Sequence, residues 1–176
     1  MKKYKYFIFN KPAKTFSSLK SIKNILSIRH YIDKLNTYSL HLVGRLDYWS
    51  RGLLLLTNNG ILSNKLIHPS FKVPKEYIIK TKGIPTKKSI LFIKYKIRGV
   101  CEIQNIGITP ERNSWFKITL NSGANKQIVN IFWGFNVPVI KIIRVSFANI
   151  NVANLLLGNI RELTNKEILI LCRLIK

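Results

Sequence analysis

The chain has 176 residues, of which 47% are hydrophobic, enough to bury the core of one domain or of two tightly joined subdomains. Thirty Lys and Arg against seven Asp and Glu give a formal net charge of +23. A field of this sign favours a polyanionic partner, with RNA or DNA first and an anionic membrane surface second. The alternative is a compositional bias, because abundant Lys, Ile and Asn would follow from an AT-rich genome whatever the function.

Several classes of protein are disfavoured by what the sequence lacks. No apolar run approaches the roughly 18 residues that a transmembrane helix needs, and the N-terminus enters a strand-like segment instead of a signal sequence. The three His show no ligand spacing, so we expect no metal. Cys101 and Cys172 lie far apart and are expected to be reduced, buried thiols of a cytoplasmic protein.

The first half of the chain predicts three strands and two helices. In chain order these are strand Tyr4–Asn10, a loop at Phe16–Leu26, helix Ile28–Leu35, strands Leu40–Val43 and Gly52–Thr57, and helix Ile61–Ile67. The strand Gly52–Thr57 contains four consecutive Leu without alternation, which predicts burial on both faces. In the helix that follows, Leu62, Leu66 and Ile67 are expected to face the core.

The second half continues without a regular strand–helix repeat. Its predicted elements are strand Glu76–Thr81, helix Lys87–Tyr95, strands Val100–Ile108 and Trp115–Leu120, helix Asn125–Trp133, the β-rich segment Val139–Ile150, and a C-terminal helix after the capping box Thr164-Asn-Lys-Glu167. This order predicts an α+β fold with a mixed, largely antiparallel sheet flanked by helices. We expect one domain over residues 1–176, with any joint between two subdomains near residues 82–86.

Asp47 is one of only two aspartates in the chain and lies between a basic loop and the very apolar Leu-rich strand. Arg45 precedes it by two residues, so both side chains could share one face of an extended segment. A nearby cation would keep the carboxylate ionised, and a positioned carboxylate serves as a nucleophile or a general base. From spacing alone, an ordinary loop Asp that bonds its own backbone is the stronger reading.

The stretch around Asp47 resembles a long family signature. Gly44-Arg-Leu-Asp47, followed by Ser50-x-Gly52-Leu-Leu-Leu-Leu-Thr-Asn-Asn-Gly60, is similar to the signature of bacterial ribosomal RNA pseudouridine synthases of the RsuA type. Further similar segments follow in the family's order: Asn10-Lys-Pro12, His68-Pro69, Lys75-Glu-Tyr77, Gly123-x-Asn125-Lys-Gln127-Ile128, Phe132, Val139–Arg144 and Gly158-x-Ile-Arg-Glu-Leu163. The resemblance covers essentially the whole chain and implies the pseudouridine synthase fold.

The resemblance implies an isomerase that converts a uridine of bacterial ribosomal RNA, with the large-subunit RNA preferred, to pseudouridine. Asp47 would be the catalytic aspartate, acting on the ribose as nucleophile or base, and Tyr77 the active-site tyrosine that stacks on the flipped base; a tyrosine that only covers the core is its alternative. Residues expected to contact RNA are Arg45, Lys75, Lys126, Gln127 and Arg144. No metal, cofactor or membrane partner is implied, and we expect a cytoplasmic monomer that consists of the catalytic domain without a separate N-terminal RNA-binding domain.

Two positions depart from the family's pattern. Val129 and Ala124 stand where the family carries basic residues, and the first of these normally pairs with the catalytic carboxylate. A buried carboxylate without a cation tends to gain a proton and lose reactivity. Lys126, Lys141 and Arg144 are the candidates for a replacement cation. The alternative function is therefore a weakened or inactive family member that binds ribosomal RNA or assists ribosome assembly.

Overall fold

The computed structural model describes residues 4–20, 24–33, 35, 39–97, 99–121 and 125–175, without the side chains of residues 125–127. The strands are β1 (Tyr6–Lys11), β2 (His41–Val43), β3 (Arg51–Thr57), β4 (Lys75–Thr81), β5 (Val100–Ile108), β6 (Ser114–Leu120), β7 (Val139–Phe147), β8 (Ile150–Asn151) and β9 (Ile160–Glu162). The helices are α1 (Arg29–Ile32), α2 (Gly60–Ile67), α3 (Lys87–Lys96), α4 (Asn125–Gly134) and α5 (Asn165–Leu174), with a 3₁₀ turn at Pro69–Phe71.

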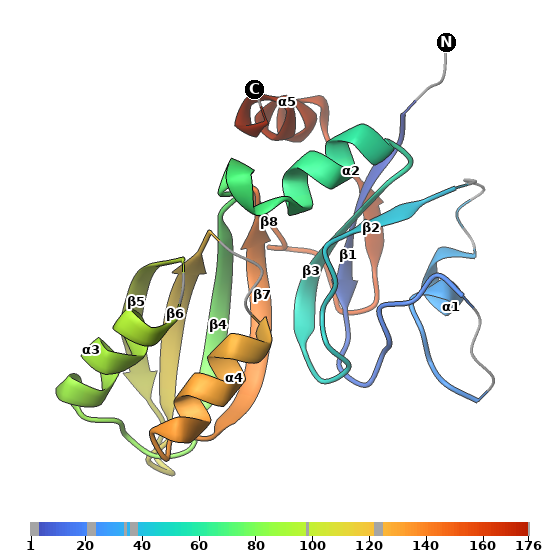
Figure 1. Ribbon diagram of the computed structural model, residues 1–176. Coiled ribbons are helices and arrows are strands. Elements are labelled where there is room, and N and C mark those ends of the chain that lie inside the picture. Colours follow the sequence, from blue (N-terminus) through green and yellow to red (C-terminus); the bar gives the residue numbers. More distant parts are fainter. Residues whose placement is uncertain are drawn as a thin grey trace.

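The strands form one sheet in the order β5-β6-β4-β7-β3-β1-β9, with β2 paired to β3 and β8 paired to β7 (Figure 1). Every pairing is antiparallel except that of β3 with β7, which is parallel. The mixed, largely antiparallel α+β fold predicted from the sequence is therefore confirmed. The strand β9 was not predicted, because its three residues, Ile160–Glu162, are too short to show a periodic pattern.

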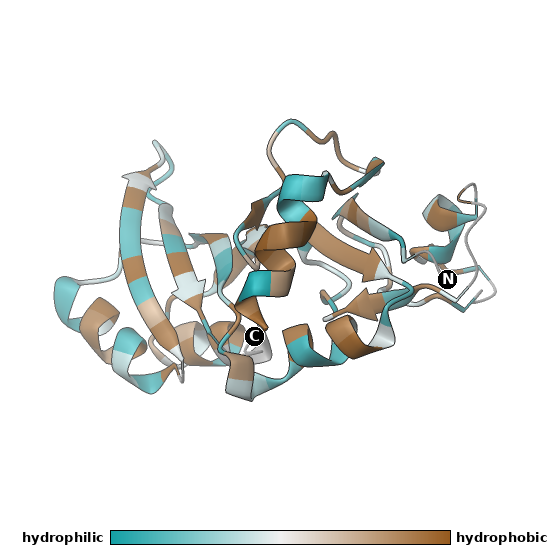
Figure 2. Cartoon of the chain, turned by 90° about the horizontal axis from the view of Figure 1, so that it is seen from above, coloured by the Kyte–Doolittle hydropathy of each residue, from teal (hydrophilic) through white to brown (hydrophobic). Residues whose placement is uncertain are grey.

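Helices α3 and α4 cover one face of the β5-β6-β4-β7 part of the sheet (Figure 1). Alternate residues of β4 and β6 point into this core, as in the buried positions Tyr77, Ile79, Phe116 and Ile118. The alternation is visible as bands along the strands at the α3 end of the molecule in Figure 2. The other residues of these strands are only half-buried, so the opposite face of this part of the sheet is accessible.

The Leu-rich strand β3 is buried on both faces, as predicted. Leu53 and Leu55 belong to the core beneath α2 and α5, whereas Leu54 and Leu56 pack into a separate core that includes residues of α1. All four side chains are fully buried. Burial of each is worth about 1.5–3 kcal/mol relative to exposure, so β3 is a well-supported strand from which a loop can be positioned.

Of three local predictions from the sequence, the capping box is confirmed, whereas those for Ile67 and for the burial of the cysteines are not. Thr164 and Glu167 form the predicted capping box at the start of α5. The prediction that Ile67 faces the core is wrong, because its side chain is 45% exposed at the last position of α2. Cys101 and Cys172 are free, as predicted, but both are exposed instead of buried. None of the helices in the described part of the chain is both long and apolar enough to cross a membrane.

Candidate active site

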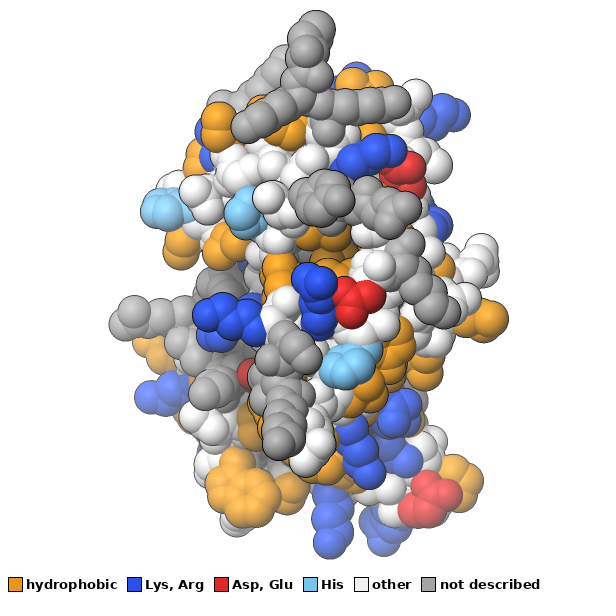
Figure 3. Space-filling view, turned by 90° about the vertical axis from the view of Figure 1, so that its right-hand side faces the viewer, with side chains coloured by type: hydrophobic (Ala, Val, Ile, Leu, Met, Phe, Trp, Pro, Cys, Tyr) orange, Lys and Arg blue, Asp and Glu red, His pale blue; other side chains and the backbone are white. Residues whose placement is uncertain are grey.

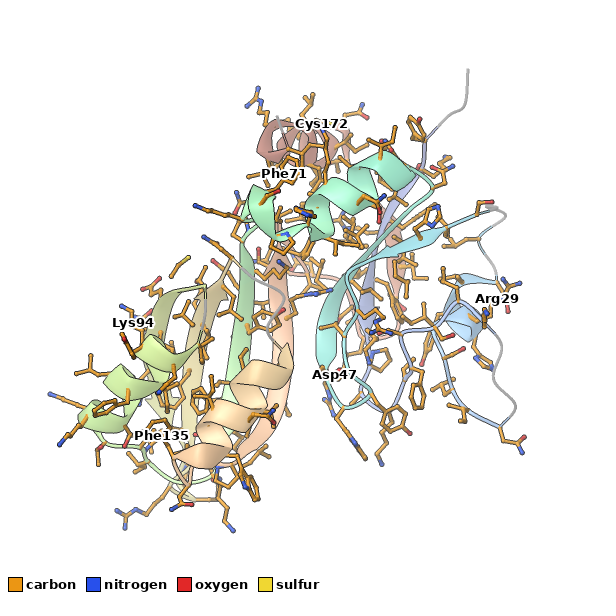
Figure 4. The ribbon with its side chains drawn as sticks, in the orientation of Figure 1. Arg29, Asp47, Phe71, Lys94, Phe135 and Cys172 are labelled. Carbon is orange, nitrogen blue, oxygen red and sulfur yellow. The ribbon has the colours of Figure 1, made fainter. Side chains whose placement is uncertain are left out.

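The candidate site is a pocket of about 910 Å³ beside the place where β3 and β7 meet. These strands pair at two positions only, Arg51 with Ile143 and Gly52 with Arg144. Asp47 lies at the end of β3 in Figure 4 and lines the pocket together with residues of β7 and α4. The residues around it are Pro12, Ala13, Lys14, Trp49, Ser50, Arg51, Val129, Asn130, Val139, Ile140, Lys141, Ile142 and Leu157.

The loop that carries Asp47 is held by the segment after β1. The Ser17 hydroxyl donates to the Leu46 carbonyl oxygen at 2.6 Å and accepts from the Leu46 amide at 3.2 Å. The Lys14 amide donates to the Tyr48 carbonyl oxygen at 2.8 Å. A turn in which the Ser50 amide donates to the Asp47 carbonyl oxygen at 3.0 Å then leads into β3. The segment after β1, which is distant in sequence, thus fixes the backbone on both sides of Asp47.

A cross-strand row lies beside this loop. On β3, Gly52 pairs with Lys11 of β1 on one edge and with Arg144 of β7 on the other, and Arg144 pairs in turn with Tyr77 of β4. Gly52 has φ +104°, and an added Cβ would overlap the Arg144 carbonyl oxygen. Only glycine therefore permits this approach of β3 to β7, which explains the glycine of the Ser50-x-Gly52 segment.

Arg144 lies where the edge of β3 passes from one partner to another. One edge of β3 pairs with β1. Along its other edge, residues 51–52 pair with β7 and residues 55–57 pair with β2. Between these pairings, Arg144 Nε donates to the Leu53 carbonyl oxygen at 2.7 Å. A Cβ on Gly44, at the end of β2, would lie 3.8 Å from Arg144 Nη1. The guanidinium thus joins β7 to β3 and leaves little room for a side chain at position 44, where the Asp47 loop begins.

Three buried cations concentrate positive charge at this place. Burial lowers the pKa of Lys11 to about 8, although the carboxylate of Asp47 raises it, and Arg144 lowers it further. Burial and Arg144 likewise lower the pKa of Lys75 to about 8. For Arg144, burial lowers the pKa, opposed by the nearby Tyr77 hydroxyl. Lys11 is held by hydrogen bonds from Nζ to the Pro12 and Thr15 carbonyl oxygens, at 3.0 and 2.8 Å.

Among the described side chains, no Lys or Arg nitrogen lies within 4.0 Å of the Asp47 carboxylate. The carboxylate nevertheless raises the pKa of Lys11, so Lys11 is a buried cation near Asp47 that we did not expect from the sequence. Its position follows from the antiparallel pairing of β1 with β3, which sets Lys11 beside Gly52. Of the candidate cations, Lys141 lines the pocket and Arg144 is buried in the row, while the side chain of Lys126 lies outside the described residues.

The other expected site residues lie at different depths. Arg45 is exposed but does not line the pocket. Lys75, Tyr77 and Arg144 are 7%, 1% and 2% exposed, respectively. None of the three lines the pocket, and Tyr77 belongs to the hydrophobic core that α3 and α4 cover. The side chain of Gln127 is not among the described ones, so its expected contact with RNA stays a prediction, as does stacking of a base on Tyr77.

The departure at Val129 has a clear structural counterpart. Its side chain is partly exposed and lines the pocket on the side opposite the loop, from α4. Ala124 lies outside the described residues. In the described ranges no three His, Cys, Asp or Glu side chains gather in a way that could hold a metal ion. Among the described residues that line the pocket, Asp47 is the one carboxylate.

The fold and this site identify the class of protein. Residues 5–132 match the RNA pseudouridylate synthase family, and the chain belongs to that family of isomerases. A solved structure described as a pseudouridylate synthase superposes with a TM-score of 0.81 over 97% of this chain and 75% of the other, at 23% identity, which supports the fold.

Sequence relatives narrow the class further. The chain is 31% identical over 170 residues to ribosomal large subunit pseudouridine synthase B of Bacillus subtilis (strain 168), covering 93% of this chain and 69% of that protein. It is 33% identical over 174 residues to the protein of the same name from Buchnera aphidicola subsp. Acyrthosiphon pisum (strain APS), covering 94% and 70%. The resemblance to the RsuA-type synthases is confirmed.

Proposed function

We propose that this chain isomerises a uridine of bacterial large-subunit ribosomal RNA to pseudouridine, with Asp47 as the catalytic residue. The observation that carries the proposal is the position of Asp47, the sole acidic residue among the described residues that line the pocket. Its loop is tied on both sides to the segment after β1, and its carboxylate raises the pKa of the buried Lys11. The relatives of this chain that are named as large-subunit enzymes support the choice of substrate.

The proposed reaction begins with extrusion of the target uridine from its stack, because the sugar is otherwise out of reach. A pocket of about 910 Å³ is at the upper end of the usual range for small ligands and has room for a nucleoside. The Asp47 carboxylate then attacks the ribose or removes a proton from it; the glycosidic bond from C1′ to N1 breaks, the uracil turns, and C1′ bonds to C5. The bond that Asp47 formed to the ribose breaks again, or the ribose proton that it removed is returned. C5 then releases its proton to a base and N1 takes up a proton, so the product is an isomer of the substrate. No cofactor takes part in this sequence.

A positive field at the pocket supports a polyanionic substrate. Lys14, Arg51 and Lys141 line the pocket, and Lys and Arg side chains also outnumber Asp and Glu on the α1 side of the molecule, which Figure 3 shows. On the accessible side of the sheet, Lys80 and Lys141 Nζ lie 5.8 and 5.9 Å from the ring centroid of Trp115, and Lys141 also lines the pocket. Cations next to an aromatic ring suit RNA phosphates and bases. We place this activity in the cytoplasm, in a monomer.

Mapping of pseudouridine tests the proposal. Large-subunit RNA that lacks the modification is incubated with the protein, treated with a carbodiimide that derivatises pseudouridine, digested and analysed by mass spectrometry. We expect one new adduct with the unmodified chain and none with Asp47→Asn. An unmodified chain that forms no adduct on large-subunit or small-subunit RNA would remove the enzymatic proposal.

A second function is favoured by Val129. An apolar side chain lines the pocket where the family pairs a basic residue with the carboxylate, and no described Lys or Arg nitrogen lies within 4.0 Å of Asp47. A protein that binds ribosomal RNA without isomerising it would bind equally well as Asp47→Asn, with an affinity that falls as salt rises. Val129→Arg distinguishes the two functions, because it restores a cation beside the carboxylate. The variant should gain isomerisation activity only if the missing cation is what limits Asp47.

A further inference from the structure

Trp49 is a large aromatic side chain at the mouth of the pocket. It lies two residues after Asp47, lines the same pocket, and is 67% exposed. Single exposed apolar residues are common on protein surfaces and need no explanation on their own. Three features distinguish Trp49 from such a residue: another aromatic ring supports its indole, a lysine lies beside the ring, and the side chain lines the pocket that contains Asp47.

The Trp49 ring is supported from beneath by other rings. Its indole meets the Tyr48 ring edge to face, with centroids 5.1 Å apart, and Tyr48 packs on Phe16 with centroids 4.6 Å apart. The Lys14 amide fixes the same short turn through the Tyr48 carbonyl oxygen. An exposed indole on a rigid base loses little conformational entropy when a flat ligand stacks on it.

The charged neighbours of the ring point to the class of ligand. Lys14 Nζ lies 5.7 Å from the Trp49 ring centroid, and Lys14, Arg51 and Lys141 line the same pocket. Proteins bind single-stranded RNA in this way, with aromatic rings for the bases and cations for the backbone. A ligand that is both aromatic and anionic, such as a nucleotide, fits this pair of residues better than an apolar peptide does.

We propose that Trp49 and Lys14 form a subsite for a nucleotide adjacent to the target uridine. The indole stacks on the base of that nucleotide and the Lys14 ammonium contacts its phosphate. When the uridine leaves its stack to reach Asp47, its neighbour loses a stacking partner, and Trp49 replaces that partner. This subsite rests on the proposed function and extends it, because it gives a residue that holds the RNA open beside the reacting nucleotide.

Tryptophan fluorescence provides a direct test, with Trp133 as the matched control. Trp133 is 66% exposed and is absent from the pocket lining. A single-stranded RNA of eight nucleotides and mixed sequence is titrated into the unmodified chain, Trp49→Phe and Trp133→Phe. We expect the RNA to quench fluorescence in the unmodified chain and in Trp133→Phe, and most of this quenching to disappear in Trp49→Phe. Quenching that survives undiminished in Trp49→Phe, whether it comes from Trp115 or Trp133, would overturn the proposal.

Kinetics on large-subunit RNA give a second readout. Stacking of one base on an aromatic ring corresponds to roughly a tenfold or larger effect, so Trp49→Ala should raise KM at least tenfold. Trp49→Phe should stay within about threefold of the unmodified chain, and Trp133→Ala should match it. Lys14→Met should reduce the slope of log affinity against log salt by about 0.7, the value for one phosphate of a single strand.

The two proposals can fail separately. If the unmodified chain isomerises uridine and Trp49→Ala has an unchanged KM, the subsite is refuted and the activity stands. If Trp49→Phe abolishes quenching while the unmodified chain isomerises no uridine, the nucleotide subsite stands and the enzymatic proposal fails.

Discussion

Replacement of Gly52 by alanine should disrupt the junction on which the site depends. The residue has φ +104°, and an added Cβ would overlap the Arg144 carbonyl oxygen and come within 2.9 Å of its carbonyl carbon and amide nitrogen. All three atoms are backbone, so no side chain can turn away to make room. Either β3 and β7 separate or the alanine adopts strained angles, and both changes move the loop that ends in Asp47.

The size of the effect can be set against a matched glycine. Gly83 also has a positive φ, +81°, but an added Cβ there meets nothing within 4 Å. Gly83→Ala should therefore cost only the backbone strain, about 1–2 kcal/mol. Gly52→Ala adds the steric overlap and should cost about 3–5 kcal/mol, in the range of the largest single substitutions.

Urea unfolding of both variants, with isomerisation measured in parallel, tests this account. We expect Gly52→Ala to be less stable than Gly83→Ala by at least 2 kcal/mol, a difference well above the usual measurement error. We also expect Gly52→Ala to lose isomerisation activity in the absence of urea, where the chain is folded. Equal stabilities of the two variants, with activity retained in both, would refute the claim that the close approach of β3 to β7 positions the site.

Three further predictions concern charged groups. The pKa of Lys11 is about 8 in the folded chain, against an ordinary value of 10.5. Between these pH values the unfolded chain binds more protons than the folded chain, so the free energy of unfolding rises from pH 8 to 10.5. Urea unfolding at both pH values should show that Lys11→Met lessens this rise by up to about 3 kcal/mol, whereas Lys14→Met, at an exposed position, should not. Arg144→Lys should lose the bond to the Leu53 carbonyl oxygen and lower the free energy of unfolding by about 1–3 kcal/mol, and an unchanged urea midpoint would contradict this. The Arg161 guanidinium and the Thr164 cap lower the pKa of Glu167 to about 2, so stability is full above pH 4.5 and falls toward pH 2; Glu167→Gln should flatten this acid limb of the stability curve.

Much of the fold was predictable because its signals are local. Alternation identified β6, the run of Leu53–Leu56 indicated a strand buried on two faces, and a capping box marked the start of α5. By contrast, Ile160–Glu162 is a strand only because β1 offers it a partner edge. Ile67 has an apolar side chain like its neighbours, but it occupies the end of α2, where the core no longer covers it.

The site divides in the same way. Asp47 was identified from a long contiguous signature, and the structure places it in a pocket. The row of Lys11, Gly52, Arg144 and Tyr77 joins residues from four strands, and its existence depends on strand order and register, which a single sequence does not contain. Lys11 lies in the Asn10-Lys-Pro12 segment that resembles the family, but only the antiparallel register of β1 with β3 sets it beside Gly52 and near Asp47.

The release of tritium from RNA labelled at C5 of uridine directly measures the isomerisation that we propose for Asp47. Formation of the bond from C1′ to C5 expels the C5 hydrogen, so each isomerised uridine releases one label into water. We expect the unmodified chain to release one equivalent from large-subunit ribosomal RNA, and Asp47→Asn to release none while binding the RNA with unchanged affinity. Release by Asp47→Asn at the rate of the unmodified chain would contradict it.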